Sequence, residues 1–364
     1  MYGLTRQTRA SALCALAFAF LVQSLTAARA EDVPPPFAIQ ASRSDPERPV
    51  RPQGQRYRGP VFDTHTHLPF YQGGVALPAT VLAAMKTAGV ARLVLMPVPN
   101  AGRVPQVGVT LKGMDAVRRQ SSGTVQVLCG SDYLTAWMHD AAALRRTPGD
   151  IDRQMARLSR DLEGSACAGV GEIGFRHYIK APGELLIDIP AGYPALLAIA
   201  ETAARANRPL EIHAEPVEPD GRRHDAEVLG TLALLAALQQ NLTLIVSHTG
   251  MTNPANARAL LLAGANVMMN INPAAHKGPV DWLNLEPVTN QERELYEDWA
   301  ALFEELSDRF MIGSDFFFGY AASVADEYER RIRHIRQMLG SLRSSVAQRI
   351  ASDNAERVYG RALP

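Results

Sequence analysis

The chain has few cysteines and no excess of charge of either sign. Only three cysteines occur in 364 residues, too few for a disulfide scaffold. The 37 Lys and Arg residues balance 37 Asp and Glu residues, so the composition does not suggest a general electrostatic grip on nucleic acid. Hydrophobic residues make up 47% of the chain, which excludes low-complexity disorder as its main state. The length allows one large domain or two ordinary ones.

The N-terminus has the pattern of a secretory signal peptide. Arg6 and Arg9 precede an uncharged apolar run at Ser11–Leu25, and Ala28 and Ala30 provide the small residues that a signal peptidase reads. The run is shorter than the ~20 apolar residues that a membrane-spanning helix needs, which argues against an uncleaved anchor. We predict a signal peptide over residues 1–30 and a periplasmic or secreted protein without a membrane attachment after cleavage.

A proline-rich segment follows at residues 31–58. It contains six prolines, so it cannot form a regular helix or a central strand. We predict an extended linker here, draped over the domain. The folded unit is then expected over residues 59–364.

Eight strand-like runs alternate with helix-like stretches along this unit. The runs are 61–65, 91–96, 124–129, 167–173, 209–213, 242–248, 266–271 and 309–314, and helical spacing occurs at 193–206, 226–240, 254–263 and 291–306. This alternation predicts βαβ units with a parallel sheet. Eight units favour an α/β fold of the (β/α)8 TIM barrel type, as a single domain. A doubly wound open sheet is the alternative.

Polar residues collect where the predicted strands end. In a barrel these ends form the active site. Four histidines and two carboxylates lie there, namely His65, His67, Glu172, His213, His248 and Asp315. Because residues two apart on a strand share a face, His65 and His67 can bind one cation together.

This set of side chains predicts a metal centre. Imidazole and carboxylate donors suit zinc, or else manganese, iron or nickel. His213 and His248, on neighbouring strands, could hold a second ion, with Glu172 as a bridge between the two. Asp315 would bind one ion and serve as the general base.

Each of these features alone has a structural alternative. A lone His-x-His motif is weak, because single histidines are often surface or satisfied core groups. Glu172 could lie in a tight turn, and Asp315 could cap the next helix. Their joint occurrence at successive strand ends favours the metal centre.

The ordered ligand set resembles the amidohydrolase superfamily of metal-dependent barrels. Asn354–Gly360 is similar to the closing helix of the amidohydrolase-2 branch, and Gly313–Asp315 to its last strand. Gly171–Gly174, with Glu at the fourth strand, is similar to the TatD nuclease branch. The resemblance implies one metal at His65, His67, Glu172 and Asp315, and another at Glu172, His213 and His248.

The chain also departs from that resemblance. Many two-metal members have a carboxylated lysine at the fourth strand, but none of the four lysines here lies at a predicted strand end. Glu172 is therefore the only bridge that the sequence offers. Decarboxylating members of the amidohydrolase-2 branch use a single metal, and there His248 would act on the substrate.

Other residues near the strand ends are candidates for substrate contacts. Arg176 and His177 could bind a carboxylate or phosphate, although an exposed loop pair is equally consistent. Glu215 could orient substrate or support the ligand two positions before it. His276 lies in the long loop 272–289, a candidate lid.

Three further expectations concern the surroundings of the site. Asp63 could anchor a ligand histidine, and the aromatic run 316–320 is expected to form a pocket wall. Cys129 and Cys167 are placed at opposite ends of adjacent strands, too far apart for a disulfide. We therefore predict two buried free thiols.

These patterns together predict an exported metal-dependent hydrolase that uses a metal-bound hydroxide on an amide, lactone or other carboxylic ester. The alternatives are a one-metal decarboxylase, a phosphodiesterase or TatD-like nuclease, and a non-catalytic metal-binding protein. A small-molecule substrate is expected, and nucleic acid is not. The sequence leaves open the substrate, the metal and the oligomeric state, a homo-oligomer included.

Overall fold

A computed structural model gives the positions of most of the chain. It describes residues 35–40, 48–69, 75–99, 109–139, 147–164, 166–178, 186–190, 192–218, 220–273, 287–290, 292–319 and 323–360. The predicted signal peptide lies outside the described residues, as do His276 and most of the predicted lid loop.

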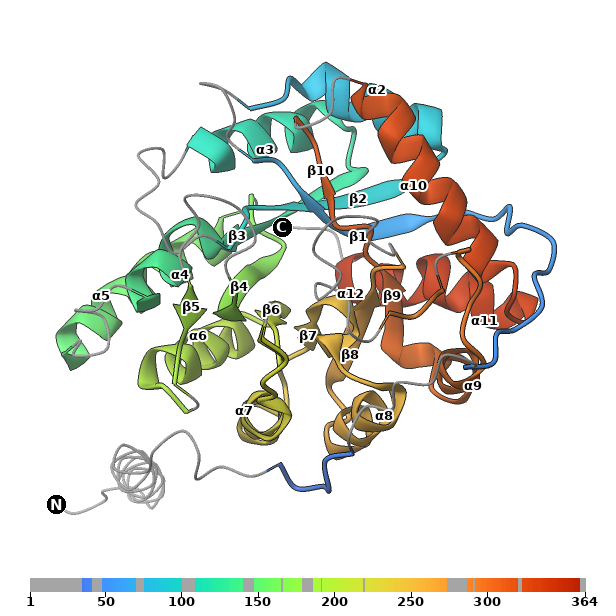
Figure 1. Cartoon of the computed structure of the whole chain (residues 1–364). Helices are drawn as coiled ribbons and strands as arrows, with labels where there is room; N and C mark the ends of the chain where they lie inside the picture. Colours follow the sequence, from blue (N-terminus) through green and yellow to red (C-terminus); the bar gives the residue numbers. More distant parts are fainter. Residues whose placement is uncertain are drawn as a thin grey trace, which may run out of the picture.

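Eight parallel strands close into a barrel (Figure 1). In order around the barrel they are β1 (Phe62–His67), β2 (Arg92–Met96), β3 (Val125–Gly130), β4 (Gly169–His177), β6 (Leu210–Ala214), β7 (Leu244–Val246), β8 (Val267–Ile271) and β9 (Phe310–Ile312). The closure is direct, since Asp63 of β1 pairs with Ile312 of β9. This confirms the predicted TIM barrel and excludes the open sheet.

Two short strands are added at the barrel mouth. Strand β5 (Ile187–Asp188) pairs antiparallel with the end of β4, and β10 (Phe316–Phe317) pairs parallel with the end of β1. Both extend the sheet beyond the carboxyl ends of barrel strands, where the candidate ligands lie.

Helices surround the barrel on the outside (Figure 1). They are α2 (Pro78–Ala88), α3 (Val109–Gln120), α4 (Ser131–His139), α5 (Pro148–Glu163), α6 (Pro194–Arg205), α7 (Asp225–Leu238), α8 (Pro254–Ala263), α9 (Glu297–Glu305), α10 (Val324–Leu339), α11 (Ser344–Gln348) and α12 (Asn354–Tyr359). Proline is the first residue of α2, α5, α6 and α8, where its missing N–H has no helical partner to lose. The sequence predicted α8 at its observed bounds, whereas the predicted helix 291–306 begins only at Glu297.

The C-terminal motif has a structural role. Asn354 donates hydrogen bonds to the carbonyl oxygens of Ser307 (2.7 Å) and Phe310 (2.8 Å), so it fixes the start of β9. Tyr359 of α12 packs with Phe62 in a small core separate from that under the outer helices. The last helix therefore supports the barrel.

The prediction of two free thiols was wrong, because Cys129 and Cys167 form a disulfide. The prediction placed Cys167 on the fourth strand, but β4 begins only at Gly169. Cys167 lies in the preceding loop, where its Cα is 5.8 Å from that of Cys129. Both side chains are buried.

The proline-rich segment lies along the barrel surface wherever it is described. Val50 forms a β-bridge with Tyr296, and Arg51 forms ion pairs with Glu297 and, at 2.9 Å, with Glu304. Residues 35–40, which we call the N-terminal strap, contact the start of α8.

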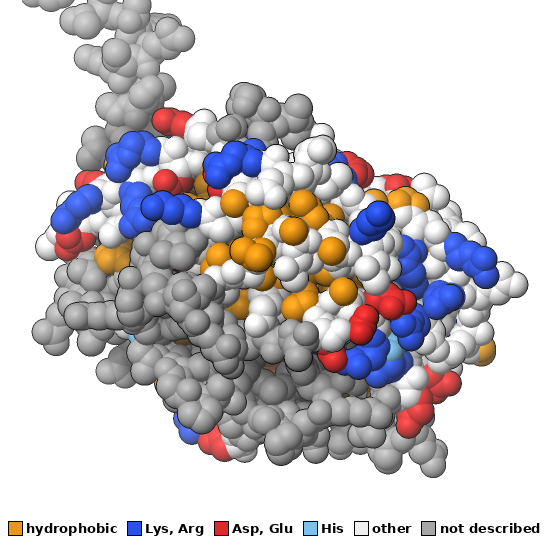
Figure 2. Space-filling view, turned by 90° about the horizontal axis from the view of Figure 1, so that it is seen from above, with side chains coloured by type: hydrophobic (Ala, Val, Ile, Leu, Met, Phe, Trp, Pro, Cys, Tyr) orange, Lys and Arg blue, Asp and Glu red, His pale blue; other side chains and the backbone are white. Residues whose placement is uncertain are grey.

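The surface carries both charges. On the face that Figure 2 shows, the described basic side chains are interspersed with acidic ones around a hydrophobic patch, without a continuous basic track. Leu77, next to α2, is 70% exposed. Within the described ranges, no helix has the length and apolar character needed to cross a membrane.

Candidate metal centre

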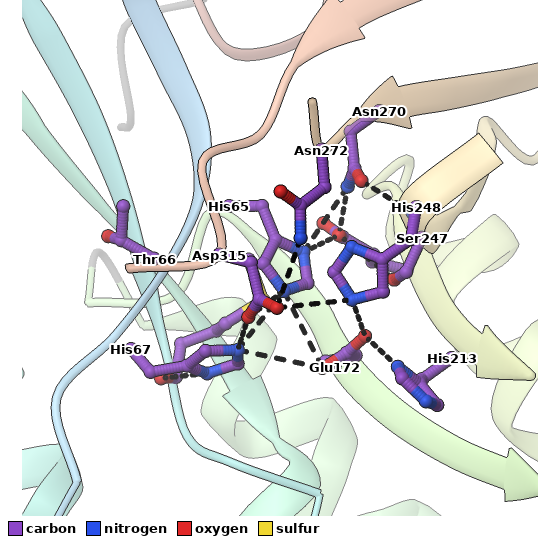
Figure 3. A network of polar contacts seen from close by, with 12 residues as sticks. His65, Thr66, His67, Glu172, His213, Ser247, His248, Asn270, Asn272 and Asp315 are labelled. Atoms are coloured by element: carbon purple, nitrogen blue, oxygen red, sulfur yellow. Dashed lines mark hydrogen bonds and ion pairs between the residues drawn. The ribbon is translucent and has the colours of Figure 1, made fainter. Parts of the chain in front are cut away.

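Two imidazoles from β1 face the same point inside the barrel mouth (Figure 3). The Nε2 atoms of His65 and His67 are 3.0 Å apart, and both rings are buried. The Nδ1–H of His65 donates to Glu211 Oε1, and that of His67 to the carbonyl oxygen of Met96 (3.3 Å). These bonds leave both Nε2 lone pairs directed at a shared ligand position, the usual arrangement of metal-binding histidines.

The carboxylate of Glu172 is divided between two pairs of histidines. Its Oε2 lies 3.6 Å from His65 Nε2 and 3.7 Å from His67 Nε2. Its Oε1 lies 2.9 Å from His213 Nδ1 and 3.7 Å from His248 Nε2. Glu172 therefore lies between two groups of donors, as the bridge hypothesis requires.

Glycines next to two of the donors allow a close approach of neighbouring strands. A Cβ on Gly171, which precedes Glu172, would lie 2.8 Å from Glu211 Cβ. A Cβ on Gly313 would lie 2.7 Å from His65 Cβ. Both distances are shorter than real Cβ contacts, so a larger residue would displace the strand ends that carry the ligands.

Asp315 completes the first group of donors. It follows β9 by three residues and has a left-handed backbone (φ 53°). Its Oδ1 lies 3.3 Å from His67 Nε2, and its Oδ2 accepts a hydrogen bond from Asn272 Nδ2 at 3.3 Å. The neighbouring Ser314 N–H donates to Asp63 Oδ1 at 2.8 Å, which fixes the chain just before the carboxylate.

His248 lies in an unusual turn after β7, and β7 is shorter than predicted. Strand β7 ends at Val246, and His248, Thr249, Gly250 and Met251 all have positive φ values between 47° and 70°. Left-handed backbone is unfavourable for residues with a side chain, so surrounding contacts must stabilise this turn. One of them is a hydrogen bond from the His248 N–H to Asn270 Oδ1 (2.8 Å).

His213 belongs to a second cluster on its outer side. Its Nε2 donates to Glu215 Oε1 at 2.7 Å, which orients the Nδ1 lone pair toward Glu172. His177 Nδ1 donates to the same Glu215 oxygen at 2.7 Å. The other oxygen of Glu215 accepts the backbone N–H of Tyr178 at 3.1 Å. Of the two predicted roles of Glu215, the geometry matches support of the ligand histidine.

The buried carboxylates and imidazoles of the centre shift one another's pKa values. Burial alone would lower the pKa of His65, but nearby carboxylates, above all Glu172, raise it to about 10. The pKa of His213 is raised to about 9 in the same way, against the effect of burial. Burial lowers the pKa of His248 to about 3, so that imidazole is neutral. Burial would raise the pKa of Glu172 and Asp315, but the surrounding imidazoles hold both well below their usual range.

The donor set fits divalent metal ions. Three groups of nitrogen and oxygen atoms from the six predicted ligands each lie within 4.8 Å of one another. They are His65–His67–Glu172, His65–His248–Asp315 and Glu172–His213–His248. Neutral imidazoles and carboxylates at such spacing match zinc and related first-row metals.

Arg176 does not contact the centre. The guanidinium is buried and forms ion pairs with Asp188 and Glu227, each at 2.9 Å, and its role as a substrate contact stays a prediction. Neighbouring residues of a strand face opposite sides, so Arg176 points away from the position that His177 occupies beside His213.

Asp63 anchors backbone rather than an imidazole. Its Oδ1 accepts the N–H of His65 (3.4 Å) besides that of Ser314, and its Oδ2 accepts the hydroxyl of Tyr328 (2.8 Å).

Phe317 lies against the His67 ring at 4.6 Å between centroids. Within the aromatic run, that residue matches the predicted wall, whereas Phe318 is buried in the core.

Sequence reasoning missed two supporting residues, Glu211 and Asn270. Glu211 Oε1 accepts hydrogen bonds from His65 and from Asn270 Nδ2, the latter at 2.5 Å. Glu211 lies two positions before His213 on the same strand face, a signal that could have identified it. Asn270 had no comparable signal, because it only becomes significant once β8 lies beside β7.

The fold and this donor set define a TIM barrel with a candidate metal centre at the strand ends. The sequence model of the family described as Amidohydrolase matches residues 62–361, so this chain belongs to that family. Membership of this family supports the prediction that the protein is a metal-dependent enzyme. No curated protein matches the chain.

Solved structures share the fold at low sequence identity. The 4-oxalomesaconate hydratase from Rhodopseudomonas palustris is 13% identical with a TM-score of 0.52, over 83% of this chain and 96% of that chain. The IDCase from Metarhizium anisopliae, in apo form, is 14% identical with a TM-score of 0.51, over 82% and 97%. At these identities the likeness shows the fold alone.

Proposed function

We propose that this chain is an exported hydrolase with two divalent metal ions, which cleaves an amide, lactone or other carboxylic ester bond of a small molecule. The observation that carries the proposal is the division of Glu172 between two pairs of histidines. A carboxylate shared in this way suits a bridge, and two-ion sites activate water for attack on carbonyl and phosphoryl groups.

The residues of the chain have distinct roles in this reaction. Bound ions would lower the pKa of a water molecule and polarise the substrate carbonyl. Asp315 is ionised at neutral pH, so it can accept the proton of the attacking water and pass it to the leaving group. Asn272 donates to one oxygen of Asp315 and so restricts its orientation.

Zinc is our first choice of metal, because nitrogen and oxygen ligands from rigid strands suit it. Manganese, iron and nickel accept the same ligands. Two features support export. The N-terminal sequence has the pattern of a signal peptide, and disulfides such as Cys129–Cys167 persist mainly in oxidising compartments.

A one-metal lyase is the main alternative. The group His65–His248–Asp315 shows that His248 also lies near the first set of donors, from which it could act on a substrate. Two ions per chain favour the hydrolase, and one ion favours the lyase. The 4-oxalomesaconate hydratase among the structural neighbours shows that this fold is not confined to hydrolases.

The test is a panel of esters, lactones and amides with the chain from residue 31 onward. Activity should disappear with a chelator and return with Zn²⁺. Asp315→Asn should lower kcat about 10²–10⁴-fold, the range of a lost general base. His334→Ala is the matched control, because His334 lies on α10 beside Arg293, outside the centre. Decarboxylation or hydration with one bound ion, and no hydrolysis, would refute the proposal.

A further inference from the structure

The N-terminal strap lies against the start of α8, which directly follows the turn carrying His248. We infer that the strap positions this turn, and that Asn256 is the positioning residue through which it acts. The inference rests on the proposed function, in which His248 holds the second metal ion.

One carboxamide binds both backbone groups of Gln40. Gln40 N donates to Asn256 Oδ1 (2.9 Å), and Asn256 Nδ2 donates to Gln40 O (3.0 Å). Asn253 Nδ2 donates to the same carbonyl at 2.9 Å. Asn256 thus pairs with the strap as a neighbouring strand would, and the contact depends on the backbone of Gln40 rather than on its exposed side chain.

The side chains of the strap alternate between half-buried and exposed. Phe37 and Ile39 are half-buried and pack against the hydrophobic core, whereas Ala38 and Gln40 are exposed. Period-two alternation is typical of an extended segment with one buried face. The strap is therefore docked by its own side chains as well as by hydrogen bonds.

The docking site also anchors the turn. Asn253 caps α8 by accepting the N–H of Asn256 (2.9 Å), and Asn256 Nδ2 donates to Thr252 Oγ1 (3.2 Å). Thr252 in turn donates to Asp225 Oδ1 (3.3 Å). These bonds fix the chain directly after the left-handed residues that begin at His248.

Loss of the strap would leave this anchor incomplete. Asn256 is fully buried, and buried amide groups without partners are unfavourable. The carboxamide would have to turn or admit water, and the turn would lose part of the support that its left-handed backbone requires. The predicted cleavage after Ala30 leaves the strap on the mature chain.

The test compares Gln40→Pro with Gln40→Ala in the chain from residue 31 onward. Proline removes the N–H that Asn256 accepts, whereas alanine keeps both backbone groups and shortens only an exposed side chain. Hydrogen exchange should accelerate at residues 247–253 in the proline variant alone, and not in β6. In a Co²⁺ titration followed by absorbance, the second equivalent should bind roughly tenfold more weakly in that variant, as for a lost support of a ligand. The first equivalent should be unchanged.

Equal exchange in the two variants would overturn the inference, and so would an acceleration spread over the whole barrel. The proposed function can fail separately. If the unaltered chain takes up no second equivalent of Co²⁺, the two-ion centre is wrong, while the exchange comparison still decides whether the strap holds the turn.

Discussion

The Cys129–Cys167 disulfide should contribute about 4 kcal/mol to the free energy of unfolding. The two cysteines are 38 residues apart in the sequence. In the chain-entropy account, closing a loop of that length removes about 13 cal/mol/K from the unfolded ensemble, which is about 4 kcal/mol at 25 °C. The link also joins the end of β3 to the loop before β4, the strand that carries Glu172.

The effect should arise in the unfolded chain rather than in the folded one. Both cysteines are buried, and free thiols tolerate burial well, so reduction should leave the packing nearly unchanged. We propose to compare urea unfolding of the oxidised and reduced chain from residue 31 onward, with a chelator in both samples. A Cys129→Ala/Cys167→Ala double variant, measured with and without reductant, controls for the reductant itself.

The reduced form should unfold at a clearly lower urea concentration, and the double variant should not respond to reductant. A difference below about 1 kcal/mol, under the roughly 2–4 kcal/mol that is typical of disulfides, would refute the reasoning. Detection of two reactive thiols in the unreduced, denatured chain would refute the disulfide itself.

Three further predictions concern the centre. Glu211→Ala should weaken metal binding about 10–100-fold, because His65 loses the partner of its Nδ1–H. Competition with a chromogenic chelator measures the affinity, and an unchanged affinity would contradict the supporting role of Glu211. Metal affinity should fall as the pH drops below about 10, and more steeply below about 9, because the ion must displace protons from His65 (pKa about 10) and His213 (pKa about 9). Calorimetry in buffers of different ionisation enthalpy measures the released protons, and a flat pH profile would contradict the pKa assignment. Tyr328→Phe should lower the free energy of unfolding by about 1–3 kcal/mol, measured by thermal or urea unfolding, because the buried carboxylate of Asp63 loses a hydrogen-bond donor. An unchanged free energy of unfolding would show that this hydrogen bond does not stabilise the fold.

The barrel could be predicted from the sequence because each strand is a short apolar run with its own turn signals. The first strand was predicted at 61–65 and lies at Phe62–His67, and α8 was predicted at its observed bounds. The errors fall where local pattern is weak. The predicted run 242–248 contains only the short strand β7, because the residues from His248 onward adopt a left-handed turn that tertiary contacts stabilise.

The six candidate ligands could also be predicted, because a barrel brings the carboxyl ends of its strands together. What surrounds them could not. Arg176 and His177 are adjacent in the sequence. Only the structure shows that Arg176 forms ion pairs with Asp188 and Glu227, whereas His177 lies beside His213. The disulfide was missed for a similar reason, since it depends on the path of the loop before β4 rather than on strand spacing.

Anomalous diffraction from crystals of the chain from residue 31 onward, grown with Zn²⁺, is the decisive test of the two-metal centre. We expect two peaks about 3.5–4 Å apart, the separation of two-metal sites, with Glu172 between them. One peak should lie beside His65 and His67, and the other beside His213 and His248. A single peak, or peaks away from these four imidazoles, would contradict the two-metal centre.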